Sequence, residues 1–381
     1  MGSVASISSE VCAAIRPIDA LLARCAREAR LLPAITSNES AQVRAHWVSQ
    51  VEAGPAPNPT WQHAARALPK GLHRMLDAVR ELCVERIPAP LASLYVARFD
   101  ELELDFAILE ALGDPARLRP LAARRFGTGA TEILLDDGPV RLHRVASSLL
   151  ASTAPAEEER SVPAEALATQ MRGAALRAGL CGFEVRVDAR LVAGAATGER
   201  GIYVADRAFG PVEARRLVAH EVFGHAIAAH NARAQPFRLL EAGSAGSFAD
   251  QEGLSLCLEE AAGALDAHRT RVLAARVLVT DRLHQGASFG ETARWLVDAQ
   301  GFSAVEAVTL TERAHRGGGV ARDAAYLAGF LRVRAALARG EVDVDVMRAG
   351  RVSLDVARAM PALIRAGLAS APALTPALKI P

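Results

Sequence analysis

The chain has 381 residues, a formal net charge of +1 and 51% hydrophobic residues. This is the composition of a globular protein long enough for one large core or two sub-domains. The near-neutral charge gives no electrostatic basis for binding nucleic acid or an anionic membrane. No run of about 18 apolar residues is present, so we expect no membrane span. Alanine and arginine are abundant and aromatic residues make up only 4%, so helices should predominate.

The five cysteines are odd in number and scattered, with no C-x-x-C pair. This pattern predicts reduced thiols and argues against a disulfide framework or a zinc finger. The N-terminus lacks a basic segment followed by an apolar core, which is the pattern of a secretory signal. We therefore expect a cytoplasmic protein.

The first part of the chain is predicted to be helical. Pro90 to Leu112 carries apolar residues at helical spacing, and Gly113 with Pro115 ends the helix. The polar, proline-flanked segment from Ser152 to Pro163 is the best linker candidate. We therefore expect an N-terminal helical region over residues 1–160 and a second region over residues 161–381, packed together as one unit.

The pattern changes after a further helix, which is predicted from Ala164 to Leu180. Phe183 to Ala189 alternates with period two, as a half-buried strand does, and Gly201 to Ala205 is predicted as a second strand after a glycine-bearing turn. Pro211 suits the first position of a helix that runs to about Ala232. The predicted fold class is α+β, mostly helical, with one small sheet just before this helix.

Two more features complete the predicted elements. A helix is expected to begin near Asp250, whose side chain can cap it, and to continue through the following apolar positions. More helices should fill the C-terminal part, interrupted by the glycine run from Gly317 to Gly319.

The stretch LVAHEVFGHAIAAH raises the question of a metal site, because His220, Glu221 and His225 lie on one predicted helix. The zinc-protease spacing is His-Glu-x-x-His, and this stretch has one residue more. In a regular α-helix an i, i+5 pair diverges by roughly 140°, against roughly 40° for i, i+4. A π-bulge adds one residue to a turn and would return both rings to one face. We place that distortion at Gly224, because glycine tolerates unusual backbone geometry.

Three carboxylates favour a metal site over three ordinary helix histidines. Glu221 stands where a general base must sit, next to a ligand. The segment from Asp250 to Leu254, with Glu252 in it, offers a carboxylate near the start of the next predicted helix, a natural third ligand. Glu259 lies two turns further along the same face, where it can bind the non-ligating nitrogen of a ligand histidine. The alternative interpretation is that His220, His225 and His230 are ordinary helix histidines with satisfied hydrogen bonds.

The motifs together resemble those of the QEGLA-motif family, whose animal members are the microtubule-associated tyrosine carboxypeptidases. The resemblance is carried by H-E-x-x-x-H, Asn231, Gln235-Pro236 and Gln251-Glu252-Gly253-Leu254, with Ser255 in place of the final alanine. It extends from about residue 55 to about residue 370 through ELELDFAILEALG and the pattern of arginines after residue 313. The segment from Arg316 to Arg322 is shorter than usual, and Arg322 stands where the family has lysine.

The resemblance implies a zinc-dependent metallopeptidase with a zincin-like catalytic region over residues 161–381, its small sheet beside the metal-binding helix. Zinc is expected on His220, His225 and Glu252, with water at the open position and Glu221 as general base. Glu259 and Asn231 are placed behind the ligands, as residues that orient them. The expected substrate is the C-terminus of a peptide or protein, with an aromatic or large apolar last residue.

A carboxypeptidase must also bind the free C-terminal carboxylate, for which a guanidinium is best suited. Arg316 and Arg322 are preferred over Arg238 because the glycine run beside Arg316 suits a close backbone approach to a ligand. Tyr326 or Tyr203 is a candidate donor to the oxyanion. An extended peptide is expected to pair with the edge of the strand from Gly201 to Ala205.

Two other functional classes remain open at this stage. One is a zinc endopeptidase or aminopeptidase, in which the arginines have no carboxylate to hold. The other is a non-catalytic regulatory member of the family, against which Glu221 argues because such a protein needs no general base. The sequence does not indicate an oligomeric state.

Overall fold

The computed structural model describes residues 9–35, 41–54, 56–59, 68–69, 71–135, 138–154, 159–191 and 193–378. Helices dominate, and the described residues include one two-stranded and one three-stranded sheet. The predicted class, α+β and mostly helical, is therefore confirmed.

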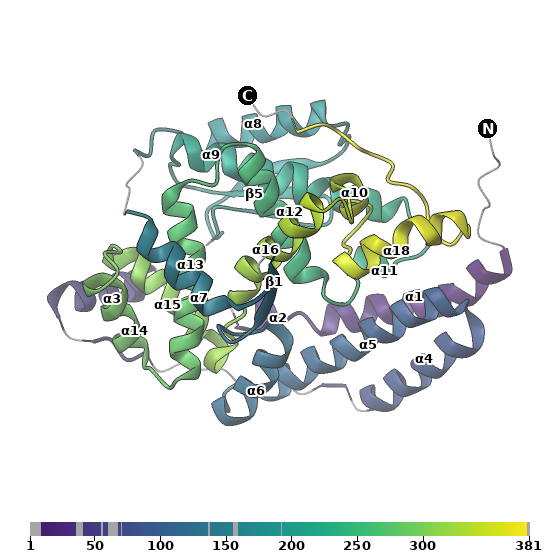
Figure 1. Ribbon diagram of the computed structural model, residues 1–381, viewed down its shortest axis with the longest axis horizontal. Helices are drawn as coiled ribbons and strands as arrows, with labels where there is room; N and C mark the ends of the chain where they lie inside the picture. Colours follow the sequence, from purple (N-terminus) through teal and green to yellow (C-terminus); the bar gives the residue numbers. More distant parts are fainter. Residues whose placement is uncertain are drawn as a thin grey trace.

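The N-terminal part is a group of helices, of which α1, α4 and α5 lie side by side (Figure 1). The helices are α1 (Ser9–Glu28), α2 (Leu31–Ile35), α3 (Ala41–Ala53), α4 (Leu72–Arg86), α5 (Ala89–Glu110) and α6 (Pro115–Phe126). The helix predicted from Pro90 to Leu112 is confirmed as α5, which begins after Pro88. It contributes Tyr95, Phe99 and Phe106 to the core, all three fully buried.

A β-hairpin follows that the sequence did not reveal. Strand β1 (Glu132–Leu135) pairs antiparallel with β2 (Gly138–Arg141), and α7 (Leu142–Ser152) continues from it. Strands of four residues are too short for a period-two pattern to stand out from chance. The expectation of a single small sheet was therefore wrong.

The second sheet stands directly before the motif helix and follows α8 (Ala164–Arg177). Its strands are β3 (Glu184–Asp188), β4 (Ala195–Thr197) and β5 (Gly201–Ala205), in the spatial order β3-β5-β4. Strand β5 pairs parallel with β3 and antiparallel with β4. The two predicted strands are confirmed as β3 and β5. However, β5 is the central strand, so the expectation that a peptide pairs with its edge was wrong.

The motif helix is a continuous rod built from three segments. They are α9 (Pro211–Leu217), the π-helix η1 (Val218–Ala226) and α10 (Ile227–Arg233). The short α11 (Leu239–Ala242) and then α12 (Ser247–Ala261) follow. Asp250 lies inside α12 and does not cap it, because its buried carboxylate accepts a hydrogen bond from the Leu354 backbone at 2.8 Å.

The C-terminal part is helical, as expected. Its helices are α13 (Ala267–His284), α14 (Phe289–Asp298), α15 (Ala304–Gly319), α16 (Ala324–Ala338), α17 (Val344–Met347) and α18 (Leu354–Arg365). The glycine run interrupts the helical geometry at the end of α15, where Gly317, Gly318 and Gly319 have φ of 74°, 89° and 110°. Glycine tolerates this left-handed region, which other residues rarely adopt.

One hydrophobic cluster extends through the described structure from Ile15 to Ala369. It takes residues from both sides of residue 160, and α7 packs against α13 while β1 packs against α16. The boundary near residue 160 stays a prediction. All five cysteines are free thiols. Among the described helices, none is both long enough and apolar enough to cross a bilayer.

Candidate metal centre

The π-helix η1 brings two histidines five residues apart onto one side of the rod. The Nε2 atoms of His220 and His225 are 3.1 Å apart, and their ring centroids are separated by 4.8 Å. The extra residue in the turn compensates for the divergence that a regular α-helix would give this spacing. The unusual motif spacing is thus accommodated by the backbone over the whole segment from Val218 to Ala226.

Gly224 lies in this segment, but the structure gives it a different role from the one predicted. Its φ is not in the left-handed region. A Cβ at this position would lie 2.3 Å from the Ser255 Oγ atom on α12. Glycine is therefore needed because η1 and α12 approach closely, and the residue opposite it on α12 must also be small.

Glu252 on α12 completes a group of three candidate ligands. Its Oε2 atom lies 3.3 Å from Nε2 of His220 and 3.9 Å from Nε2 of His225, and all three ligand atoms lie within 4.8 Å of one another. Tetrahedral zinc with bonds of about 2.05 Å would place its ligand atoms about 3.3 Å apart. The three observed separations lie within about 0.6 Å of that value, so these residues could hold a metal ion of this kind.

The chemistry of the three atoms also fits a cation. The Glu252 Oε2 atom is buried, and Nε2 of His220 lies 3.3 Å from it. Nδ1 of His220 is 2.7 Å from the Glu259 carboxylate, so a neutral His220 carries its proton there and presents a lone pair at Nε2. Lone pairs that converge at this distance repel unless a proton or a metal ion lies between them.

Glu259 orients His220 and is itself held by an arginine. Arg269 donates to both Glu259 oxygens at 3.0 Å. Burial raises the pKa of Glu259, but Arg269 and His220 outweigh burial and hold it at about 2. Burial likewise opposes the charge on His220, while hydrogen bonds with Glu252 and Glu259 raise its pKa to about 10. The ligand set therefore attracts positive charge strongly.

Glu221 is buried beside the ligands, and its carboxylate is held from the neighbouring sheet. Thr197 on β4 donates its hydroxyl to the Glu221 Oε2 atom at 2.7 Å, and the same hydroxyl lies 3.1 Å from the Glu221 carbonyl oxygen. Sequence reasoning missed Thr197. It lies in a three-residue strand that was expected to be part of a turn, and no motif marks it.

The other residues of the Gln251–Leu254 motif have packing roles. Gln251 donates to the carbonyl oxygens of Met347 and Val352 and so fixes the segment between α17 and α18. A Cβ on Gly253 would lie 2.3 Å from the backbone of Gly329 on α16. The motif therefore contains the candidate ligand Glu252 and two residues, Gln251 and Gly253, whose contacts position α12.

Asn231 is placed differently from the prediction, because it contacts the C-terminal segment and no metal ligand. Its buried amide donates to the carbonyl oxygens of Arg348 and Leu374 and accepts from the Leu374 backbone. Gln235, one turn later, binds Ser370 and Ala349 in the same way. Asn231 in α10 and Gln235 just after it therefore hold the segment that contains Ser370 and Leu374 against the end of the motif helix.

A cluster of arginines surrounds Asp323 near the metal-ligand group. Arg313 forms a partly buried ion pair with Asp323. Arg276 lies 3.9 Å from the same carboxylate, and its guanidinium lies over the Tyr326 ring. Burial raises the pKa of Asp323, but Arg313 and Arg276 outweigh it and lower the pKa strongly. The single negative charge of Asp323 is thus shared by Arg313 and Arg276, and it cannot neutralise further arginines nearby.

Arg316 and Arg322 keep unsatisfied donors in this cluster. Nε and Nη2 of Arg316 and Nε of Arg322 are buried without a hydrogen-bond partner among the described residues. Burial and the neighbouring arginines lower the pKa of Arg316 to about 10, with Asp323 opposing them. The charge of Arg322 is close enough to lower the pKa of Glu252. These two guanidinium groups suit a bound carboxylate.

Sequence reasoning missed a group of aromatic rings, Phe126, Phe248 and Tyr326, that pack against one another next to Arg322. Phe248 stands one turn before Glu252 on α12, and its ring makes edge contacts with Tyr326 at 5.9 Å and Phe126 at 5.8 Å. The Arg322 guanidinium lies over the same ring at 4.9 Å. Phe248 therefore lies on the same helix as the candidate ligand Glu252 and contacts Arg322, a candidate carboxylate-binding residue.

Tyr203, a predicted substrate residue, and Arg238, the less favoured arginine, are both exposed. Tyr203 pairs with Ala196 across the sheet, while the neighbouring pair Thr197 and Ile202 faces η1. Because successive side chains on a strand point to opposite faces, Tyr203 points away from Glu221. Tyr203 is 39% exposed. The Arg238 side chain is 63% exposed and lies near Glu241. A substrate role for either residue stays a prediction.

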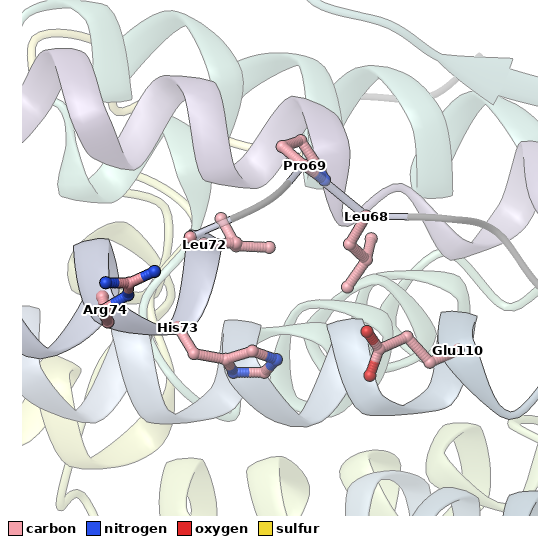
Figure 2. Close-up of a pocket in the computed structure, with 7 residues that line it drawn as sticks. Leu68, Pro69, Leu72, His73, Arg74 and Glu110 are labelled. Carbon is pink, nitrogen blue, oxygen red and sulfur yellow. The ribbon is translucent and has the colours of Figure 1, made fainter.

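The pocket in Figure 2 is separate from the metal-ligand group. Its volume is about 330 Å³, and it is lined by Leu68, Pro69, Gly71, Leu72, His73, Arg74 and Glu110. These residues belong to α4, its preceding segment and the end of α5, and the pocket includes none of the candidate site residues. It does not mark the metal centre.

One family of known proteins matches the chain. The sequence model of the family described as microtubule-associated tyrosine carboxypeptidase matches residues 52–380. Searches of curated proteins and of solved structures gave no match. The family match spans most of the chain and includes the η1 histidines, the Gln251–Leu254 motif and the arginine cluster. The chain belongs to the microtubule-associated tyrosine carboxypeptidase family.

Proposed function

We propose that this protein is a zinc-dependent carboxypeptidase that removes an aromatic or large apolar residue from the C-terminus of a peptide or protein. The observation that carries the proposal is the convergence of His220, His225 and Glu252 beside a buried Glu221. The family match supports the peptidase class. The zinc requirement and the residue preference are our inference.

In this proposal His220, His225 and Glu252 hold the metal. When bound, zinc would act as a Lewis acid that polarises the scissile carbonyl and acidifies the attacking water. Glu221 takes the proton from that water and later delivers it to the departing amine. The Tyr326 hydroxyl donates to the carbonyl oxygen. Burial and the nearby Glu252 charge raise the pKa of Tyr326, which keeps this donor protonated.

Recognition of a free C-terminus is assigned to Arg316 and Arg322. Their buried, unpartnered guanidinium nitrogens are donors that a carboxylate would satisfy. Phe248 and Tyr326 lie next to them, and their rings offer a surface for a large last side chain. This arrangement favours a carboxypeptidase over an endopeptidase or an aminopeptidase, neither of which has a substrate carboxylate at this position.

The substrate backbone is assigned to the outer edge of β4. In the β4–β5 hairpin Gly198 donates to Gly201 at 2.8 Å, and Ala205 donates to Gly194 at 2.9 Å. Because hydrogen-bonded and non-hydrogen-bonded pairs alternate, the backbone groups of Ala195 and Thr197 point away from β5. An extended peptide would pair with these groups by strand addition.

The test compares one peptide supplied as the free acid and as the C-terminal amide, with the zinc-loaded protein. We expect release of the last residue from the free acid only, fastest for tyrosine, phenylalanine or leucine at the end. The matched control is Glu221→Gln, which keeps the volume of the side chain and should lose ~10² to 10⁴ in rate. Equal cleavage of both peptides, or internal products, would favour the endopeptidase class. An inactive wild type that binds zinc would favour a regulatory protein.

A further inference from the structure

The carboxylate of Glu221 is held by a residue outside the motif. The Thr197 hydroxyl lies 2.7 Å from the Glu221 Oε2 atom, and Glu221 is only 5% exposed. Among the described residues no other side chain is hydrogen-bonded to this carboxylate. The orientation of the proposed base therefore depends on one hydroxyl group.

That hydroxyl has two acceptors for a single proton. The carboxylate is nearer, at 2.7 Å, than the Glu221 carbonyl oxygen, at 3.1 Å. Hydrogen bonds to an ionised acceptor are shorter and stronger than those to a neutral one, so the proton points to the carboxylate. This contact restrains one oxygen and leaves Oε1 available to accept a proton from water.

The position of Thr197 is set by the sheet. Its pairing with Ile202 fixes the side of the sheet on which its side chain lies, and that side faces η1. The contacts of the hydroxyl with the carboxylate and the carbonyl oxygen of Glu221 then hold its orientation. Thr197 also belongs to the strand edge that we assign to the substrate backbone.

We propose that Thr197 is a positioning residue for the general base Glu221. It fixes the carboxylate in the orientation needed for proton transfer and takes no part in metal binding. The inference rests on the proposed peptidase function, because it concerns the same site. It predicts that the hydroxyl of Thr197, and not its bulk, controls the rate of the proton-transfer step.

The test uses Thr197→Val, which has the same shape without the hydroxyl, and Thr197→Ser, which keeps the hydroxyl. We expect Thr197→Val to lower kcat by ~10- to 100-fold, the range for residues that orient a metal site, with KM and zinc content unchanged. Thr197→Ser should keep most of the wild-type kcat. A Thr197→Val protein with the wild-type kcat, or equal losses in both variants, would overturn the inference.

A double variant separates positioning from general damage to the fold. In the Glu221→Gln background, Thr197→Val should change the residual rate by less than a factor of about two, because there is no base left to orient. Full additivity of the two losses would overturn the inference even if each protein folds. If the wild type hydrolyses none of the peptides, the proposed function fails and the inference with it. An active wild type with an equally active Thr197→Val protein contradicts the inference alone.

Discussion

His220 lies between two carboxylates that have different tasks. Glu252 faces its Nε2 atom and is a candidate ligand, while Glu259 holds its Nδ1 atom at 2.7 Å. The second contact fixes the tautomer that a metal ligand requires. Arg269 neutralises Glu259, so the buried carboxylate does not depend on His220 alone. The hydrogen bond at Nδ1 of His220 thus leaves Nε2 to face Glu252.

Replacing His225 by alanine is expected to abolish zinc binding. The variant loses one of the three converging ligand atoms, and two ligands do not complete a catalytic zinc site. Elemental analysis of the purified proteins should give one zinc per wild-type chain and close to none for the variant. His230→Ala, five residues further along the same rod, is the matched control and should keep its zinc. Undiminished zinc in His225→Ala would contradict the ligand assignment.

Replacing Glu259 by glutamine is expected to weaken zinc binding by ~10- to 100-fold, the usual range for a residue that orients a ligand. The amide has no charge to stabilise the His220 ring or to neutralise Arg269. A competition titration with a chelator measures the zinc affinity. The neighbouring Glu260→Gln is the control, because its side chain is 44% exposed and pairs with Arg334. Equal affinities for the two variants would rule out the orienting role.

At the scale of elements, the site depends on close helix contacts. The π-helix approaches α12 at Gly224 and Ser255, and α12 crosses α16 at Gly253 and Gly329. At the second crossing a Cβ on Gly329 would lie 1.9 Å from the Ala249 carbonyl oxygen. Backbone on both sides cannot move aside, so small residues are required there.

Gly253→Ala is therefore expected to destabilise the fold by at least ~1 to 3 kcal/mol, the usual cost of overpacking. The added methyl group would contact backbone atoms of Gly329 at 2.3 Å. Denaturant unfolding should show a lower midpoint. Gly173→Ala in α8 is the control, because its added methyl would meet only the flexible Arg177 side chain. That substitution should be neutral or stabilise the helix by up to about 1 kcal/mol. A Gly253→Ala midpoint at or above that of the control would show that this crossing tolerates a side chain.

At the scale of the whole molecule, the end of the chain returns to the motif helix. Asn231 and Gln235 bind backbone groups near Ser370 and Leu374, more than a hundred residues away in sequence. Figure 1 shows the yellow C-terminal segment crossing from α18 back towards α8, past α10. The motif rod is thereby connected to the last part of the fold.

Asn231→Ala is expected to lower the free energy of unfolding by about 3 kcal/mol or more. The substitution removes the partner of the buried Arg348 carbonyl and of two partly buried backbone groups of Leu374, and an unsatisfied buried group costs ~1 to 3 kcal/mol. The zinc affinity of the folded protein should change little, because Asn231 contacts no ligand. Thermal unfolding and the chelator titration measure the two effects. Loss of zinc without loss of stability would instead support the predicted position behind the ligands.

The sequence alone determined the features that local pattern encodes. Helix α5 and strand β3 have apolar residues at the periods of their structures, so both were predictable. The motif around His220 indicated the metal chemistry, and the five-residue spacing indicated a π-type turn. The family resemblance was also carried by short motifs, and the match over residues 52–380 confirms it.

Only the tertiary structure decided which residues surround the motif. Thr197 and Glu221 are separated by 24 residues, and His220 and Glu259 by 39. The place of β5 at the centre of its sheet, the outward direction of Tyr203 and the attachment of Asn231 to the chain end all depend on packing between distant segments. Local periodicity determines which face of a helix or strand is buried, but not which other element packs against that face. The packing partner depends on how all the buried surfaces fit together.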